Sequence, residues 1–178
     1  MNGLRELSSL HSEKLKKIKV CLFDVDGVLT DGKLFWAGEE VGFNRLFHTH
    51  DGYGMKTLMR AGLKVGIITG GNSIGVQKRF EGLGVDHLYM GSDDKRESFE
   101  EILKLEQVSA EECLYMGDEF FDLPILKRVG FSASVPDASL EVKESVDYIS
   151  LKKGGNGAAR EVIDLLRYAQ NIVPEIEF

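Results

Sequence analysis

Residues 20–27 have the sequence Val20-Cys21-Leu22-Phe23-Asp24-Val25-Asp26-Gly27. Four consecutive apolar residues of this kind are typical of a strand that is buried on both faces of a parallel sheet. The acidic residues lie where such a strand ends, and Gly27 permits a tight turn and a close approach of the backbone to a ligand. The segment therefore predicts an α/β fold with a carboxylate, Asp24, at the carboxyl end of its first strand.

Apolar runs of similar length recur along the chain and alternate with amphipathic stretches. The further runs lie at 65–68, 87–89, 113–116, 131–135 and 148–149. Helical spacing occurs at 53–61, from Asn72 or Ser73 to 82–84, and at 158–169, while Ser109 begins a sequence typical of a single capped turn. Strands and helices in alternation predict right-handed crossovers and a doubly wound, mostly parallel sheet.

One segment departs from this alternation. Residues 33–47 contain two aromatic-rich stretches, 33–36 and 43–47, on either side of a glycine-bearing turn. This pattern predicts a β-hairpin that projects from the sheet. Because an isolated hairpin is marginally stable in water, we expect its apolar side chains to pack against a neighbouring subunit.

The composition bounds the class of protein. A length of 178 residues fits one domain, 1–178, and 43% hydrophobic with 29% charged residues is typical of a soluble globular protein. No run approaches the roughly 20 apolar residues of a membrane span, and the charged N-terminus favours a cytoplasmic location. A net charge of −7 argues against nucleic-acid binding. We expect Cys21 and Cys113 to be reduced thiols in the core.

The residues that follow the predicted strands form a chemically coherent set. Ligands of a doubly wound sheet bind beyond the carboxyl ends of its strands. The residues found there are Asp24 and Asp26, then Thr69 and Gly70, then Lys95, and finally Asp118 and Asp122. Converging carboxylates repel one another unless a cation holds them together, and Mg²⁺ prefers such oxygen ligands. We expect Asp24, Asp26 and Asp118 to bind Mg²⁺, and Asp122 to contact it directly or through water.

These residues suit phosphoryl transfer. Asp24 would attack phosphorus and form an aspartyl phosphate that water later cleaves. Asp26 would protonate the leaving alcohol and then activate the water. Thr69 and the amide of Gly70 would donate hydrogen bonds to the phosphate, and Lys95 would supply positive charge for the transition state. The set predicts a magnesium-dependent phosphohydrolase.

Three other classes of protein use some of these features. Asp-x-Asp-Gly also occurs in calcium-binding loops. Response-regulator receiver domains place a phospho-acceptor Asp after their third strand, where this sequence has none. Dinucleotide binding would require a Gly-x-Gly-x-x-Gly segment, which is absent from the sequence. A catalytically silent assembly protein is a further alternative, but it would have no reason to retain the whole acidic set.

The chain resembles the haloacid dehalogenase superfamily in its Asp-x-Asp, Thr, Lys and Gly-Asp-x-x-x-Asp segments. It resembles the 3-deoxy-D-manno-octulosonate 8-phosphate phosphatases more narrowly, through residues 22–32, 51–54, 67–70 and 154–161. The resemblance implies a Rossmann-like core without an inserted cap domain and a sugar-acid phosphate as substrate. It also implies a homotetramer in which hairpins and C-terminal segments of neighbouring subunits help to close the active site.

The departures from the family pattern lie on the substrate side. His50 and Gly71 stand where the family usually has arginines, so two bidentate partners for a sugar carboxylate are missing. Another sugar phosphate or a nine-carbon sugar-acid phosphate is therefore an alternative substrate. The loop at 154–157 either binds an anion or simply begins the last helix. The residues predicted to bind substrate are Gly70, His48, Thr49, His50, Asp51, Gly52, Lys56 and Arg79.

Overall fold

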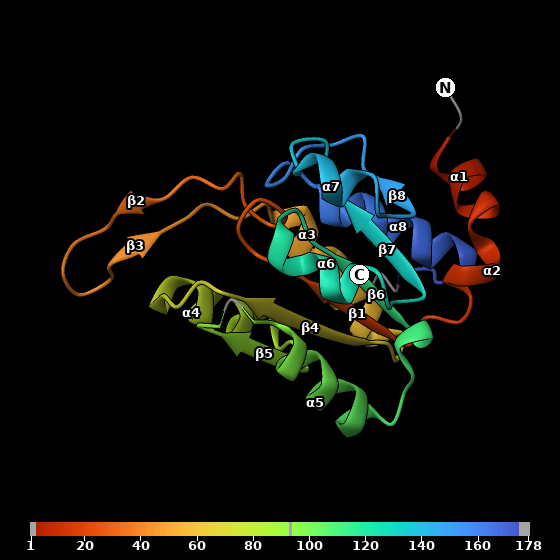
Figure 1. Ribbon diagram of the computed structural model, residues 1–178, viewed down its shortest axis with the longest axis horizontal. Coiled ribbons are helices and arrows are strands. Elements are labelled where there is room, and N and C mark those ends of the chain that lie inside the picture. The colour runs from red at the N-terminus through yellow and green to blue at the C-terminus, as the bar shows by residue number, and fades with distance from the viewer. Residues whose placement is uncertain (1–2, 93, 175–178) are drawn as a thin grey trace.

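A six-stranded parallel sheet forms the centre of the computed structural model, which describes residues 3–92 and 94–174 (Figure 1). The strand order is β5-β4-β1-β6-β7-β8, with every pair parallel. The bounds of the strands are Val20–Phe23 for β1, Lys64–Thr69 for β4, His87–Met90 for β5, Cys113–Met116 for β6, Phe131–Ser134 for β7 and Tyr148–Ile149 for β8. Each strand falls on a predicted apolar run, so the predicted doubly wound α/β fold is confirmed.

Helices cover both faces of this sheet. Their bounds are Leu4–Leu10 for α1, Ser12–Leu15 for α2, Thr49–Arg60 for α3, Ile74–Leu83 for α4, Arg96–Glu106 for α5, Leu123–Leu126 for α6, Leu140–Lys143 for α7 and Ala158–Ala169 for α8. α8 packs against both α1 and α3, and α4 contacts α3. α5 packs against α6, which lies on β6 and β7. Right-handed crossovers on the two sides of β1 place these groups on opposite faces.

Helix ends agree with the sequence signals at several places. The Ser73 hydroxyl accepts a hydrogen bond from the amide of Val76, and α4 ends at Gly84 in a left-handed conformation. A single 3₁₀ turn, Ala110–Glu112, begins with the predicted capping box of Ser109. The bounds of α8 are those predicted.

The start of α3 was predicted wrongly. The helix begins at Thr49, not at residue 53, so its first turn contains Asp51 and Gly52. The low helix propensity of glycine concealed this turn. Tertiary packing explains the glycine in this turn, because a Cβ at Gly52 would overlap the guanidinium of Arg79 on α4.

The core surrounds β1, all four residues of which are buried. Cys21 and Cys113 are free and buried in it, as expected for core thiols. Within residues 3–92 and 94–174, no helix combines the length and the apolar character needed to cross a membrane.

The predicted hairpin is present and projects away from the layered core (Figure 1). Its strands, β2 (Phe35–Trp36) and β3 (Phe43–Asn44), pair antiparallel. The rings of Trp36 and Phe43 meet edge to face with centroids 5.2 Å apart. Both rings nevertheless stay exposed, Trp36 by 53% and Phe43 by 56%. The hairpin therefore carries apolar surface that the described part of the chain does not cover.

Candidate active site

The carboxyl ends of β1 and β6, which are neighbours in the sheet, bring three predicted acids together. Asp24 follows β1, Asp118 follows β6, and Asp122 ends the 3₁₀ turn Phe120–Asp122. One carboxylate oxygen from each of the three lies within 4.8 Å of the other two. We call Asp24, Asp118 and Asp122 the acid cluster.

Two glycines allow this close approach. Gly27 has φ +91°, and a Cβ at this position would overlap the carboxylate of Asp118. A Cβ at Gly117 would likewise overlap the side chain of Asp122. The absence of side chains at these positions thus makes room for the acid cluster.

A third glycine contact closes the loop that follows Asp24. Gly154, in the loop before α8, packs so tightly on this loop that a Cβ there would overlap the carbonyl oxygen of Gly27. The amide of Gly155 donates to the carbonyl of Val28 at 3.0 Å. Residues from two distant parts of the sequence therefore shape the backbone beside Asp24.

Lys95, the residue before α5, places a buried ammonium group against the acid cluster. Its Nζ lies 2.6 Å from Asp24 Oδ1 and 2.7 Å from Asp122 Oδ1, and the residue is only 1% exposed. Burial acts to lower the pKa of Lys95, but the two carboxylates outweigh burial and raise that pKa. The ring of Phe121 also faces Nζ, with its centroid 4.6 Å away. Lys95 is therefore a permanent cation that offsets part of the negative charge.

Asp122 has no acceptor site left unused. Its Oδ1 accepts from Lys95 and, at 2.6 Å, from the hydroxyl of Tyr115. Its Oδ2 accepts from the amides of Asp118 at 3.0 Å and Glu119 at 3.2 Å. Two carboxylate oxygens offer about four lone-pair sites, and four donors occupy them. Sequence reasoning missed Tyr115, although a tyrosine inside a fully buried strand signals a hydrogen-bond partner nearby.

Two other oxygens of the cluster lack such partners. Among the described residues, no hydrogen-bond donor reaches Asp24 Oδ2 or Asp118 Oδ1, and both atoms are buried. Burial raises the pKa of Asp24 to about 6 although Lys95 opposes the shift. Burial also raises the pKa of Asp118 to about 8, and the charges of Asp24 and Asp122 add to this effect. Unpaired buried carboxylates are costly, so this pair of oxygens fits a hard divalent cation.

The carboxylate of Asp26 lies apart from the acid cluster. It accepts a bidentate pair of hydrogen bonds from Arg45, with Nε–Oδ1 at 2.5 Å and Nη2–Oδ2 at 2.7 Å. Sequence reasoning grouped Asp26 with the other acids and did not identify Arg45. No local sequence signal would have found it, because Arg45 reaches Asp26 only through the path of the hairpin.

Thr69 ends β4 and is 2% exposed. Its Oγ1 accepts a hydrogen bond from the amide of Gly71 at 3.1 Å. That contact uses a lone pair and leaves the hydroxyl proton available to donate to a phosphate oxygen.

Comparison with known proteins agrees with this geometry. Residues 53–130 match the haloacid dehalogenase-like hydrolase family. The 3-deoxy-D-manno-octulosonate 8-phosphate phosphatase of Escherichia coli K12 is 37% identical over 164 residues, which cover 91% of this chain and 86% of that protein. The chain belongs to this phosphatase family.

Solved structures extend the similarity to three dimensions. The Moraxella catarrhalis 3-deoxy-D-manno-octulosonate 8-phosphate phosphatase, crystallised with magnesium, phosphate and KDO, matches with a TM-score of 0.87 and 37% identity. That match covers 92% of this chain and 93% of the other. The cobalt-bound Haemophilus influenzae phosphatase matches with a TM-score of 0.84 and 37% identity, over 89% and 92% of the two chains.

Most of the residues predicted to bind substrate lie on or directly before α3, while Arg79 lies on α4. Four of them line one small hollow, namely His48, Asp51, Gly52 and Arg79. The His48 ring accepts a hydrogen bond from the amide of His50 at 3.3 Å and so caps the helix. Thr49 and Lys56 also lie on α3, and Gly70 follows β4. Their contacts with substrate remain predictions.

Asp51 has a structural role in addition to any contact with substrate. It is 3% exposed, and its Oδ1 accepts from the amide of Arg160 in the first turn of α8 at 2.8 Å. Burial raises the pKa of this carboxyl, and the hydrogen bond from Arg160 opposes that shift. A carboxylate of the chain itself therefore occupies the helix N-terminus that follows the loop at 154–157.

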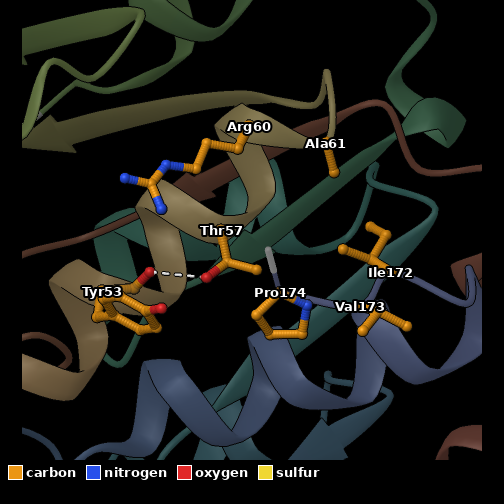
Figure 2. A pocket seen from close by; sticks show the side chains of 7 residues that line it. All are labelled: Tyr53, Thr57, Arg60, Ala61, Ile172, Val173 and Pro174. Atoms are coloured by element: carbon orange, nitrogen blue, oxygen red, sulfur yellow. Dashed lines mark hydrogen bonds between the residues drawn. The ribbon is translucent and has the colours of Figure 1, made fainter. Parts of the chain in front are cut away.

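A larger cavity lies elsewhere and contains none of the predicted site residues. Figure 2 shows it between α3 and the segment that follows α8. Its volume is about 160 Å³, and its lining residues are Tyr53, Thr57, Arg60, Ala61, Ile172, Val173 and Pro174. None of the described residues that line it is a buried carboxylate or a lysine, so the acid cluster is the better candidate for catalysis.

Proposed function

We propose that this protein is a magnesium-dependent phosphatase that hydrolyses 3-deoxy-D-manno-octulosonate 8-phosphate to the free sugar acid and phosphate. The observation that carries the proposal is the pair of unpartnered buried oxygens on Asp24 and Asp118, beside the ammonium of Lys95. Family membership supports the same chemistry.

In the first half-reaction, a carboxylate oxygen of Asp24 attacks phosphorus while the bond from phosphorus to the sugar oxygen breaks. Asp26 gives a proton to that departing oxygen, which leaves as an alcohol. Lys95 holds Asp24 in place at 2.6 Å. The Thr69 hydroxyl and the Gly70 amide donate to the phosphate oxygens.

In the second half-reaction, Asp26 takes a proton from a water molecule as the water oxygen attacks phosphorus. The bond from phosphorus to the Asp24 oxygen breaks, which releases phosphate and restores the free carboxylate. Asp26 is then protonated again and ready for the next substrate.

The metal-binding roles follow from which oxygens are free. Asp24 and Asp118 would hold Mg²⁺ through their unpartnered oxygens. Asp26 lies two residues after Asp24, in the loop that follows β1. Bound Mg²⁺ would offset the repulsion between the phosphate and the Asp24 carboxylate. Because four donors already occupy Asp122, we assign it the role of positioning Lys95 and the 118–119 backbone.

One substitution and one chelation experiment test this mechanism at its centre. Asp24→Asn should lower phosphate release by about 10⁴-fold or more, because it removes the nucleophile with little change in shape. Circular dichroism should be unchanged. Chelation by EDTA should stop the wild-type enzyme, and added Mg²⁺ should restore it. Retention of full activity by Asp24→Asn would refute the proposal.

The identity of the sugar acid needs its own test, because His50 and Gly71 stand where the family has arginines. Rates of phosphate release from three substrates would settle it. We expect 3-deoxy-D-manno-octulosonate 8-phosphate to exceed a nine-carbon sugar-acid phosphate and glucose 6-phosphate in kcat/KM. A higher value for either of the others would reassign the substrate and leave the phosphatase mechanism intact.

We also propose that the enzyme is a homotetramer in which the hairpin packs against a neighbouring subunit. Exposed apolar side chains on and beside the hairpin support this, namely Leu34, Phe35, Trp36, Val41, Phe43 and Leu46. Sedimentation velocity measures the assembly directly, and a monomer at working concentration would exclude it. The cytoplasmic location expected from the sequence likewise remains a prediction.

A further inference from the structure

Arg45 is a buried arginine that directly follows β3, where the chain returns from the hairpin. Its side chain is only 5% exposed, whereas the two hairpin strands, β2 and β3, carry exposed aromatic rings. Arginine is almost never buried without a partner. Its partner here is Asp26, to which the proposed mechanism assigns proton transfer.

Gly71 leaves room beside its Cα for the guanidinium of Arg45. A Cβ at Gly71 would lie 3.1 Å from Arg45 Nη2, 3.1 Å from Asp26 Oδ2 and 3.3 Å from Thr69 Oγ1. The sequence predicted that Gly71 removes a guanidinium from the site. The structure instead has the guanidinium of Arg45 beside the same Cα, delivered from the hairpin.

Three different nitrogens fix the orientation of this guanidinium. Nε and Nη2 form the bidentate pair with Asp26, and Nη1 donates to Ser73 Oγ at 2.9 Å. Ser73 is itself held as the N-cap of α4. Besides Arg45, the carboxylate of Asp26 has only a 3.4 Å contact with the hydroxyl of Thr30 among the described residues. Arg45 is therefore the main group that orients Asp26.

We propose that Arg45 is a positioning residue that holds the Asp26 carboxylate for proton transfer. The inference rests on the proposed function, in which Asp26 gives a proton in one half-reaction and takes one in the next. Each Asp26 oxygen accepts one hydrogen bond from Arg45 and has a second lone pair, which can carry this proton. Its carboxylate has to stay in one place through both steps. A planar fork that binds both oxygens provides this, and the single ammonium of a lysine does not.

The test compares two substrates that differ in their need for a proton donor. The sugar alkoxide of 3-deoxy-D-manno-octulosonate 8-phosphate needs a proton to leave, whereas the nitrophenolate of p-nitrophenyl phosphate leaves without one. kcat/KM reports the steps up to departure of the leaving group. Arg45→Ala should lower kcat/KM about 100-fold on the sugar phosphate. It should lower kcat/KM less than about 10-fold on p-nitrophenyl phosphate, because that substrate bypasses general acid catalysis.

Conservative variants and chemical rescue separate positioning from folding. Arg45→Lys should recover only part of the loss, and millimolar guanidinium ion should partly restore Arg45→Ala. Ser73→Ala removes one anchor and should produce a smaller loss with the same preference between substrates. Arg128→Ala is the control, because Arg128 pairs with the exposed Glu100 and should alter neither rate.

Equal losses on the two substrates would overturn the inference and assign Arg45 to phosphate binding or to folding. Unchanged kinetics of Arg45→Ala on both substrates would overturn it as well. A wild-type enzyme that released phosphate from neither substrate would instead overturn the proposed function, and this inference with it.

Discussion

The acid cluster is buried and the hairpin is exposed, yet in both regions some groups have no partner within the described chain. Asp24 and Asp122 are at most 2% exposed, whereas Trp36 and Phe43 are more than half exposed. The cluster has more buried negative charge than Lys95 balances, and the hairpin has more apolar surface than the described chain covers. In each region we propose a binding partner for the unsatisfied feature, a cation in the first and another subunit in the second.

The largest effect on stability is expected at the centre of the acid cluster. Lys95→Met removes the buried cation between Asp24 and Asp122 and leaves two buried carboxylates without compensation. We expect the free energy of unfolding to fall by about 3–5 kcal/mol in urea titrations without metal. Lys78→Met, which removes an exposed pair with Glu81, should cost less than about 1 kcal/mol. Equal losses of stability in the two variants would show that Lys95 does not offset the negative charge of the acid cluster.

Two glycines with similar, positive φ angles sharpen the contrast between the regions. Gly27 has φ +91° and Gly38, in the hairpin turn, has φ +96°. An alanine should cost about 1–2 kcal/mol of backbone strain at either position. Nothing lies within 4 Å of a Cβ at Gly38, but a Cβ at Gly27 would displace Asp118.

Mg²⁺ titration by calorimetry distinguishes the two glycine variants. Gly27→Ala should weaken Mg²⁺ affinity about 10- to 100-fold, because it moves an expected ligand. Gly38→Ala should leave that affinity unchanged. Equal Mg²⁺ affinity in the two variants would remove Asp118 from the metal site.

The pH dependence of stability should reveal the buried charge of Asp118. The pKa of Asp118 is about 8, raised from an ordinary 3.8, so between these values the folded protein binds a proton that the unfolded chain has released. Stability of the metal-free protein should therefore fall as pH rises from about 4 to about 8. Asp118→Asn should lessen this fall by up to about 4 kcal/mol between pH 5 and 8.5. Urea titrations at pH 5 and 8.5 measure it.

Mg²⁺ provides the control for the pH experiment. A bound cation stabilises the ionised carboxylates, so saturating Mg²⁺ should flatten the decline for the wild-type protein. It should have little effect on Asp118→Asn. A decline that persists unchanged with Mg²⁺ would contradict the assignment.

The smallest effect on folding is expected in the hairpin. Replacing Trp36 and Phe43 together by serine should change the free energy of unfolding of the monomer by less than about 0.5 kcal/mol, because both rings are exposed. The same change should shift the protein to smaller species in sedimentation velocity. Leu105→Ser, at an equally exposed apolar residue on α5, should leave the assembly intact. Dissociation by both variants would argue against a specific role of the hairpin.

The sequence predicted the sheet and the acid cluster because their signals are local. Each strand is a continuous apolar run. The carboxyl ends of parallel strands lie at the same edge of the sheet, so the sheet topology alone predicts that Asp24 approaches Asp118. Arg45 and Tyr115 were missed for the opposite reason. Arg45 depends on the three-dimensional course of the hairpin, and the role of Tyr115 depends on where the turn at 120–122 places the carboxylate of Asp122. The same dependence separated Asp26 from the other acids.

The contact of Gly154 and Gly155 with the loop after β1 has a consequence for biosynthesis. A chain emerges from the ribosome N-terminus first, so Asp24 is among its earliest residues to appear. The loop that closes over its backbone follows more than a hundred residues later. β1 also has to wait for β6, its neighbour in the centre of the sheet. Nascent chains that stop before residue 154 should therefore carry the nucleophile and still be unable to use it.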